Sequence, residues 1–296
     1  MEDNELEAYK KAGSIAREVR EWSKNLLKPG EKIFEIAEKI EDKIKSAGAE
    51  VAFPVNICIN DITAHYTPKF QEDNSIGEED VVKVDIGVHV DGYIADTAYT
   101  IDFSGKYKRM LEVNEKALNT AIEMIKPGAL VSEIGRAIYE CITKEGFKPI
   151  ENLTGHEIKR YDLHAGISIP NIPVPYNWKI KKDMVLAIEP FVTNGYGRVV
   201  ESKRIEIFSF LDEKPTRIKE ARSIIEKARE REKLPFAQRW FSKDFSTIKL
   251  DLIFRDLTIR KILKSYPILH EKEKGIVSQF EHTVIVTDNG CEVITE

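Results

Sequence analysis

The sequence of 296 residues has few cysteines, no long hydrophobic run and no excess of positive charge. The three cysteines, Cys58, Cys141 and Cys291, are odd in number and far apart, which excludes a disulfide framework and a CxxC zinc site. Because no window approaches about eighteen apolar residues, no segment is expected to span a membrane. The first residues, Met1 to Glu5, lack the basic and apolar regions of a signal peptide, so we expect a cytoplasmic protein.

Charge and hydrophobic content narrow the class of protein further. Asp and Glu number 50 against 45 Lys and Arg, a net charge of −5, which argues against DNA or RNA as the main ligand. Hydrophobic residues make up 42% and charged residues 32%, which supplies a sizeable core and excludes disorder as the main state. The length fits one large domain or two ordinary ones.

The sequence contains an internal repeat. A Lys-Pro-Gly turn, a Glu-Ile pair and a helix-ending glycine recur at a constant offset of 98 residues, as Gly30 and Gly128 illustrate. Apolar residues at helical spacing follow each turn, and a strand ending in a carboxylate follows later, at 81–85 and 184–189. The repeat predicts two αβ halves related by a pseudo-two-fold axis, with a site where their sheets meet. The alternative is coincidence between two helical hairpins that both use Pro-Gly turns.

A charged segment at about 205–266 interrupts the second half. Residues 220–233 have oppositely charged pairs at four-residue spacing and are expected to be helical, as are residues 246–264. We therefore expect a helical insertion subdomain at 205–266 within a single domain that spans 1–296. The last strand is expected at 278–286.

The stretch from Val84 to Thr97 predicts a β-hairpin with two acidic residues on one face. Asp91-Gly92 between two β-rich runs is a strong signal for a two-residue hairpin turn. With that turn Asp85 pairs with Ala98, and Asp96 is its diagonal neighbour on the same face. Two such carboxylates repel each other, and a divalent cation removes that cost. An exposed hairpin with polar faces is the alternative, but Asp85 follows buried-type valines, and only Lys83 is an obvious partner.

Further acidic residues and histidines occur at strand ends elsewhere. They lie in Gly155-His156, His164-Ala165-Gly166, Ile188-Glu189-Pro190 and Phe280-Glu281-His282-Thr283. Each alone is weak evidence, since a single histidine is more often a packing or surface residue than a ligand. Together with the hairpin they indicate an oxygen-rich cluster.

The order of these residues resembles the metal ligands of the methionine aminopeptidase, proline dipeptidase and creatinase superfamily. The residues that match its five ligands are Asp85, Asp96, His156, Glu189 and Glu281. The resemblance covers essentially the whole chain and implies the α+β pita-bread fold, in which two pseudo-symmetric αβ halves surround an antiparallel sheet. Within the superfamily the sequence is most similar to short, archaeal-like type 2 methionine aminopeptidases. Only 84 residues precede Asp85, and Glu189 and Glu281 are 92 positions apart, as a helical insertion requires.

The resemblance also implies a reaction and roles for individual residues. It implies removal of the initiator methionine from nascent proteins with a small second residue, by a hydroxide that two divalent ions activate. Co, Mn, Fe or Zn suits the ligand set. Glu189 would transfer the proton, His65 and His164 would contact the substrate, and Phe53 would line the methionine pocket. His89 and His270 match nothing, and His282, next to a ligand, should point to the opposite face.

Partners and alternatives follow from the same resemblance. The expected partner is the N-terminus of a nascent polypeptide, and the expected state is a monomer, while contact of the insertion with the ribosome is left open. One rival is an Xaa-Pro peptidase of the same superfamily, against which the short N-terminal part and the insertion argue. The other is a non-catalytic pita-bread protein that binds RNA or a protein, against which the full ligand set argues.

Overall fold

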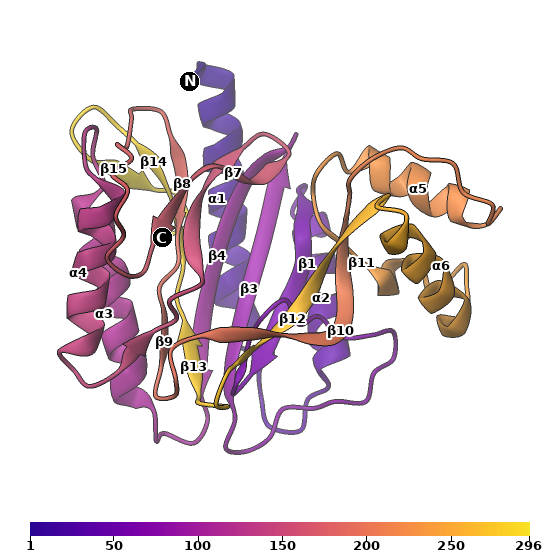
Figure 1. Ribbon diagram of the computed structural model, residues 1–296, viewed down its shortest axis with the longest axis horizontal. Coiled ribbons are helices and arrows are strands. Elements are labelled where there is room, and N and C mark those ends of the chain that lie inside the picture. Colours follow the sequence, from indigo (N-terminus) through magenta and orange to yellow (C-terminus); the bar gives the residue numbers. More distant parts are fainter.

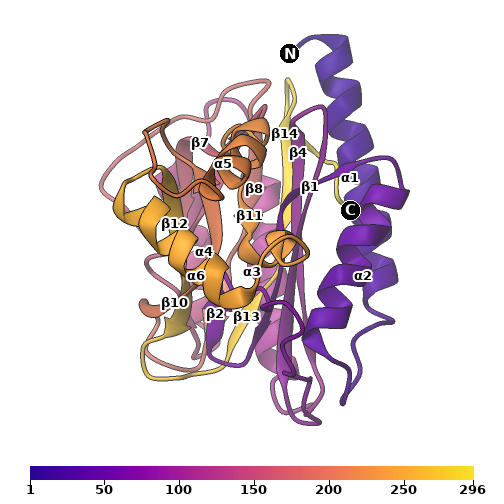
Figure 2. The same cartoon turned by 90° about the vertical axis from the view of Figure 1, so that its right-hand side faces the viewer.

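The computed structural model describes residues 1–296. It has two αβ halves, and a helical segment is inserted within the second. The first half contains α1 (Asp3–Ser23), α2 (Ile33–Ser46), β1 (Glu50–Ile59), β2 (Ile62–Ala64), β3 (Val81–Val90) and β4 (Tyr93–Asp102). The second half begins with α3 (Lys108–Met124), α4 (Val131–Thr143), β5 (Lys148–Pro149), β6 (Thr154–Lys159), β7 (Asp162–Pro170), β8 (Val185–Ile188) and β9 (Phe191–Thr193). Figure 1 shows α3 and α4 on one side of the central strands, and Figure 2 shows α1 and α2 along another.

The rest of the chain leaves the second half and returns to it. It comprises β10 (Val199–Phe210), α5 (Ala221–Glu230), β11 (Phe236–Ala237), the 3₁₀ turn η1 (Gln238–Phe241), α6 (Thr247–Ile259), β12 (Leu263–Glu271), β13 (Val277–Gln279), β14 (His282–Val286) and β15 (Cys291–Val293). β14 pairs with β8, so the end of the chain completes the sheet of the second half. None of the helices is long and apolar enough to cross a membrane.

The repeated motif has the same local geometry in both halves. Gly30 and Gly128 have φ values of +90° and +88°, which favour glycine, and their N–H groups donate to the carbonyls of Ile76 (2.7 Å) and Ile180 (2.8 Å). α2 and α4 begin three residues after these glycines. The second half has a core of 17 buried residues, and a larger core of 35 buried residues is built mainly from the first half with some residues of the second. The predicted pair of αβ halves is confirmed.

Threonine side chains join the two halves along β4. Thr283 Oγ1 donates to the carbonyl of Asp96 and accepts from its N–H, both at 2.8 Å. Thr97 Oγ1 donates to the carbonyl of Glu281 at 2.9 Å, and Thr100 Oγ1 to that of Gln279 at 2.6 Å. A backbone bridge between Ala98 and Glu281 lies among them. β4 therefore holds β13 and β14 in register at the centre of the molecule.

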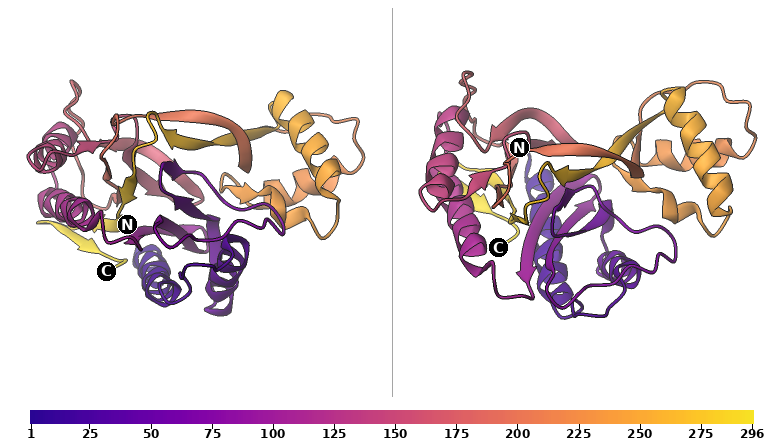
Figure 3. Two further views of the ribbon diagram at one scale, coloured as in Figure 1. Left: turned by 90° about the horizontal axis from the view of Figure 1, so that it is seen from below. Right: turned by 60° about the horizontal axis from the view of Figure 1, so that its bottom comes forward.

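The helical segment stands at the end of an antiparallel ribbon formed by β10 and β12 (Figure 3). The helices expected at 220–233 and 246–264 correspond to α5 and α6, but the edges of the expected insertion at 205–266 are strand, through Phe210 and again from Leu263, where the two residues pair. α6 ends at Ile259 because Lys261 adopts a left-handed φ of +57°. The expected strand 278–286 is interrupted at Phe280 and Glu281.

A buried ion pair anchors the helical segment to the first half. The Arg239 guanidinium on η1 contacts Glu41 of α2, and the two side chains are only 1% and 3% exposed. Arg239 also donates to Thr67 Oγ1 at 2.6 Å, and Trp240 Nε1 donates to Glu41 Oε2 at 2.7 Å. Arg231 adds bonds to the carbonyls of β1.

Replacing Arg239 by Met should therefore destabilise the protein strongly. The change leaves the Glu41 carboxylate buried without its cation, which costs about 3–5 kcal/mol of unfolding free energy. Chemical denaturation followed by tryptophan fluorescence measures this. Lys249→Met is the matched control, because its pair with Glu220 is exposed on both sides and is worth about 0–1 kcal/mol. Equal losses for the two variants would contradict the anchoring role.

Candidate metal centre

One cavity at the junction of the halves brings all the predicted site residues together. It has a volume of about 350 Å³ and is lined by residues from both halves and from the β10–β12 ribbon. Its lining includes the eight residues singled out from the sequence, namely Phe53, His65, Asp85, Asp96, His156, His164, Glu189 and Glu281. Residues up to 228 positions apart in the chain thus meet at one place.

The hairpin of β3 and β4 places the first two carboxylates. Asp91 and Gly92 have φ values of +51° and +86°, as a type I′ turn requires, and glycine meets the second value without strain. The resulting register pairs Asp85 with Ala98 and Gly87 with Asp96. Asp85 and Asp96 therefore share one face of the sheet, as the sequence predicted.

The second half contributes the other three polar groups. β8 and β14 pair up to Ile188 and His282, so Glu189 and Glu281 lie next to each other where this pairing ends. His156 lies on β6, opposite Ala187 of β8. The backbone bridge from Glu281 to Ala98 brings all three toward the hairpin.

Four of the five side chains lie close to one another, those of Asp96, His156, Glu189 and Glu281. His156 Nε2 lies 3.5 Å from Glu189 Oε1 and 3.7 Å from Asp96 Oδ2. Ligand atoms of Asp96, His156 and Glu281 lie within 4.8 Å of one another. Gln279 Nε2, which sequence reasoning did not single out, donates to Asp85 Oδ2 and Glu281 Oε2 at 3.3 Å each.

Burial makes the ionised form of these carboxylates unfavourable when no cation is bound. Burial raises the pKa of Asp85 to about 6, against the smaller lowering effect of its hydrogen bonds with Gln279 and Asp96. Burial and then repulsion between neighbouring carboxylates raise the pKa of Asp96, Glu189 and Glu281 well above the usual range. Burial lowers the pKa of His156 to about 4, which keeps its imidazole neutral. No Lys or Arg lies within ion-pair distance of the four carboxylates.

Unsatisfied polar atoms show that the residues fit a metal. Buried atoms without a hydrogen bond include Asp85 Oδ1, Asp96 Oδ1, His156 Nδ1 and Glu281 Oε1. The one lysine that the sequence offered as a partner, Lys83, donates instead to the carbonyls of Asn60 (2.9 Å) and Val277 (3.0 Å). Four carboxylates and one imidazole are a donor set for a divalent ion.

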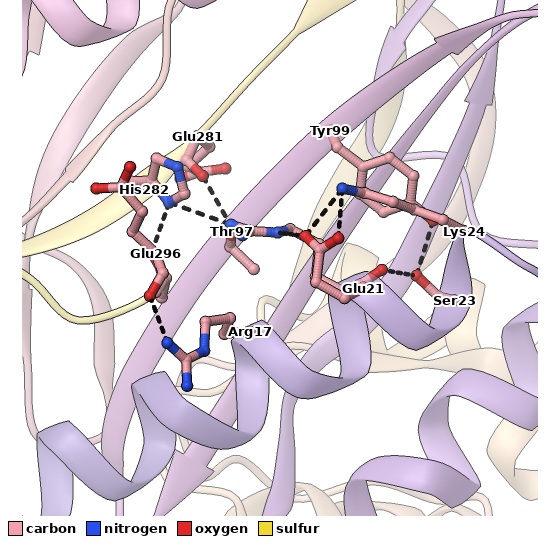
Figure 4. Close-up of polar contacts among 11 residues, drawn as sticks. Arg17, Glu21, Ser23, Lys24, Thr97, Tyr99, Glu281, His282 and Glu296 are labelled. Carbon is pink, nitrogen blue, oxygen red and sulfur yellow. Dashed lines mark hydrogen bonds and ion pairs between the residues drawn. The ribbon is translucent and has the colours of Figure 1, made fainter.

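A second polar layer supports the cluster from behind (Figure 4). Arg20 of α1 donates to Thr97 Oγ1 at 2.9 Å, and Thr97 in turn holds the Glu281 carbonyl. His282 Nδ1 contacts Arg20 at 3.2 Å and Thr295 at 2.9 Å. His282 thus points away from the cavity, as its position next to Glu281 predicted.

The remaining predicted residues form the cavity walls. The His164 ring lies 4.5 Å from that of His156, and His65 Nδ1 lies 3.2 Å from the carbonyl oxygen of Pro267. Phe53 of β1 lies against Gly87, where a Cβ atom would come within 2.2 Å of its ring. Gly87 therefore lets the aromatic ring approach the sheet between the two aspartates.

Sequence reasoning missed the walls that the β10–β12 ribbon supplies. Ile207, Lys264 and Tyr266 line the cavity, although the sequence assigned them to a helical insertion. Their place depends on pairing between distant strands, and the alternation of apolar residues in 205–210 was the only local signal. His270, expected in a loop, lies in β12 and contacts Asp61 at 2.9 Å.

Comparisons with known proteins agree with this site and fold. Residues 7–288 match metallopeptidase family M24. The chain is 45% identical to the methionine aminopeptidase of Methanocaldococcus jannaschii, with 99% of this chain and 100% of that protein covered. The chain belongs to metallopeptidase family M24. Within M24 it is of the archaeal methionine aminopeptidase type, and this family implies divalent metal ions.

Solved structures of low sequence identity show the pita-bread fold. The methionine aminopeptidase of Thermotoga maritima superposes with a TM-score of 0.73 at 23% identity and covers 100% of this chain and 98% of its own. A thermophilic Arx1 superposes with a TM-score of 0.87 at 16% identity, over 99% and 91%. The fold class expected from the sequence is confirmed for this M24 member.

Metal binding by this M24 chain should release protons. Since the folded-state pKa of Asp85 is raised, the metal-free protein holds more protons than the unfolded chain, and its stability falls as the pH rises from about 4 to about 6. Titration calorimetry with Mn²⁺ at pH 6, in buffers of different ionisation enthalpy, measures the release. Glu281→Gln should release fewer protons, whereas Glu201→Gln, exposed on β10, should match the wild type. An enthalpy independent of buffer would contradict this expectation.

Proposed function

We propose that this chain hydrolyses the first peptide bond of polypeptides that begin with methionine, preferring a small second residue. The observation that carries this proposal is the single cavity lined by Phe53, His65, His164 and the five acidic and imidazole groups. The similarity to methionine aminopeptidases over the full chain supports the choice of methionine. The partner would be the N-terminus of a nascent protein in the cytoplasm.

The proposed ligands are Asp85, Asp96, His156, Glu189 and Glu281, holding two divalent ions. Their unsatisfied buried atoms and mutual repulsion support this assignment. Oxygen-dominated ligation with one imidazole suits Co, Mn, Fe or Zn. When bound, such ions lower the pKa of water and polarise a carbonyl group.

The protein's own groups would manage protons and orientation. Burial raises the pKa of Glu189, so it is the cations that would keep it ionised; the Glu189 carboxylate would then take a proton from the attacking water and pass it to the leaving amine. Because the Pro267 carbonyl can only accept, His65 donates from Nδ1 and leaves Nε2 as an acceptor for the leaving N–H. Burial keeps His164 neutral by lowering its pKa, so it would donate to the substrate carbonyl.

The architecture supports a further proposal about domains. Residues 1–296 would form one catalytic domain, because the cavity uses both halves and the ribbon, and would act as a monomer, because one chain supplies the lining. The insertion subdomain lies between β10 and β12 and has its own core of 12 buried residues.

Replacing His164 or Glu189 by Ala should reduce kcat by about 10²- to 10⁴-fold. The assay measures methionine released from the peptide Met-Ala-Ser by the wild type and each variant, loaded with Mn²⁺ or Co²⁺. His164→Ala should keep its metal, which elemental analysis checks, whereas Glu189→Ala should lose part of it. His270→Ala is the control and should retain activity, because His270 does not line the cavity.

Two results would overturn the proposal. If the metal-loaded wild type releases no methionine from Met-Ala-Ser, the proposed function is wrong. If it cleaves Xaa-Pro peptides faster than Met-Ala peptides, the proline-specific rival is favoured.

A further inference from the structure

A second cavity adjoins the cavity of the candidate metal centre. This cavity has a volume of about 210 Å³. Five residues line both cavities, namely Leu163, His164, Pro235, Lys264 and Tyr266. The two spaces therefore meet at one shared wall between β7 and the β10–β12 ribbon. Phe210 and Leu211 also line the second cavity, and Leu211 is 53% exposed.

Lys264 is the cation of that shared wall, and it has no counter-charge. Its side chain is exposed, and its Nζ lies 4.7 Å from the centroid of the Tyr266 ring. No carboxylate lies within 4.0 Å of it, whereas Lys233, which lines only the second cavity, contacts Asp162 at 2.6 Å. Burial chiefly lowers the pKa of His65, and the Lys264 charge adds to that effect. The positive charge of Lys264 thus acts on His65, a residue that lines the metal-centre cavity.

We propose that the second cavity holds the substrate residues that follow the scissile bond, and that Lys264 favours an acidic side chain at the third or fourth position. This inference rests on the proposed aminopeptidase function. With the first residue at the metal centre, an extended chain advances about 3.3–3.6 Å per residue. The second residue then lies at the shared wall beside His164, and the next two enter the space beside Lys264 and Lys233. Lys233 is neutralised by Asp162, so Lys264 alone offers an unpaired charge there.

Matched peptides test this inference. The peptides are Met-Ala-Xaa-Ser-Gly-Ser-Ser amides with Glu, Gln or Lys as Xaa, so they differ only in the side chain at the third position. Amidation removes the charge of the C-terminal carboxylate. For the wild type, kcat/KM should be about two- to tenfold higher with Glu than with Lys at low salt. The ratio should approach one at 1 M salt, where the Debye length is about 3 Å. Moving Glu or Lys to the seventh position should give a ratio near one.

Variants identify the residue responsible. Lys264→Gln should remove the preference, and Lys264→Glu should reverse it. Lys39→Glu, an exposed lysine of α2 that lines neither cavity, has the same effect on net charge and should keep the preference. Equal rates for Glu and Lys peptides, or a preference that survives in Lys264→Glu, would overturn this inference. Absence of turnover with every peptide would instead refute the proposed function.

Discussion

Mutual repulsion among buried carboxylates is the constraint on which the rest of this structure depends. Asp85, Asp96, Glu189 and Glu281 come from both halves and converge with no lysine or arginine nitrogen within 4.0 Å of their carboxylate oxygens. Several of their oxygen atoms are buried and have no hydrogen bond. Such a cluster can exist in the folded protein only if other contacts hold its strands in place. A bound cation would remove the repulsion between the carboxylates.

Those contacts are the side-chain hydrogen bonds along β4. Thr97, Thr100 and Thr283 bind the backbone of the opposite strand on either side of the acidic residues. Arg20 and His282 continue the support on the outer face, where the sheet meets α1. The larger core contains residues of both halves, so apolar packing as well as these hydrogen bonds holds the junction together.

Local signals predicted the parts of the fold that local chemistry decides. The Asp91-Gly92 turn set the register of the hairpin and so the places of Asp85 and Asp96, and the glycines of the repeat marked its helix ends. Contacts between distant segments were beyond such reasoning. The pairing of β10 with β12 turned the edges of the expected insertion into strands, and the same pairing brought Lys264 and Tyr266 to the cavity. Family resemblance, and not spacing, linked His156, Glu189 and Glu281 to the hairpin.

Anomalous X-ray diffraction from crystals of the Mn²⁺-loaded protein tests the central claim most directly, because it locates the ions independently of activity. The account predicts two anomalous peaks about 3.5–4 Å apart, both among Asp85, Asp96, His156, Glu189 and Glu281. Peaks elsewhere, or an ordered cluster of these side chains that binds no ion at saturating Mn²⁺, would contradict it.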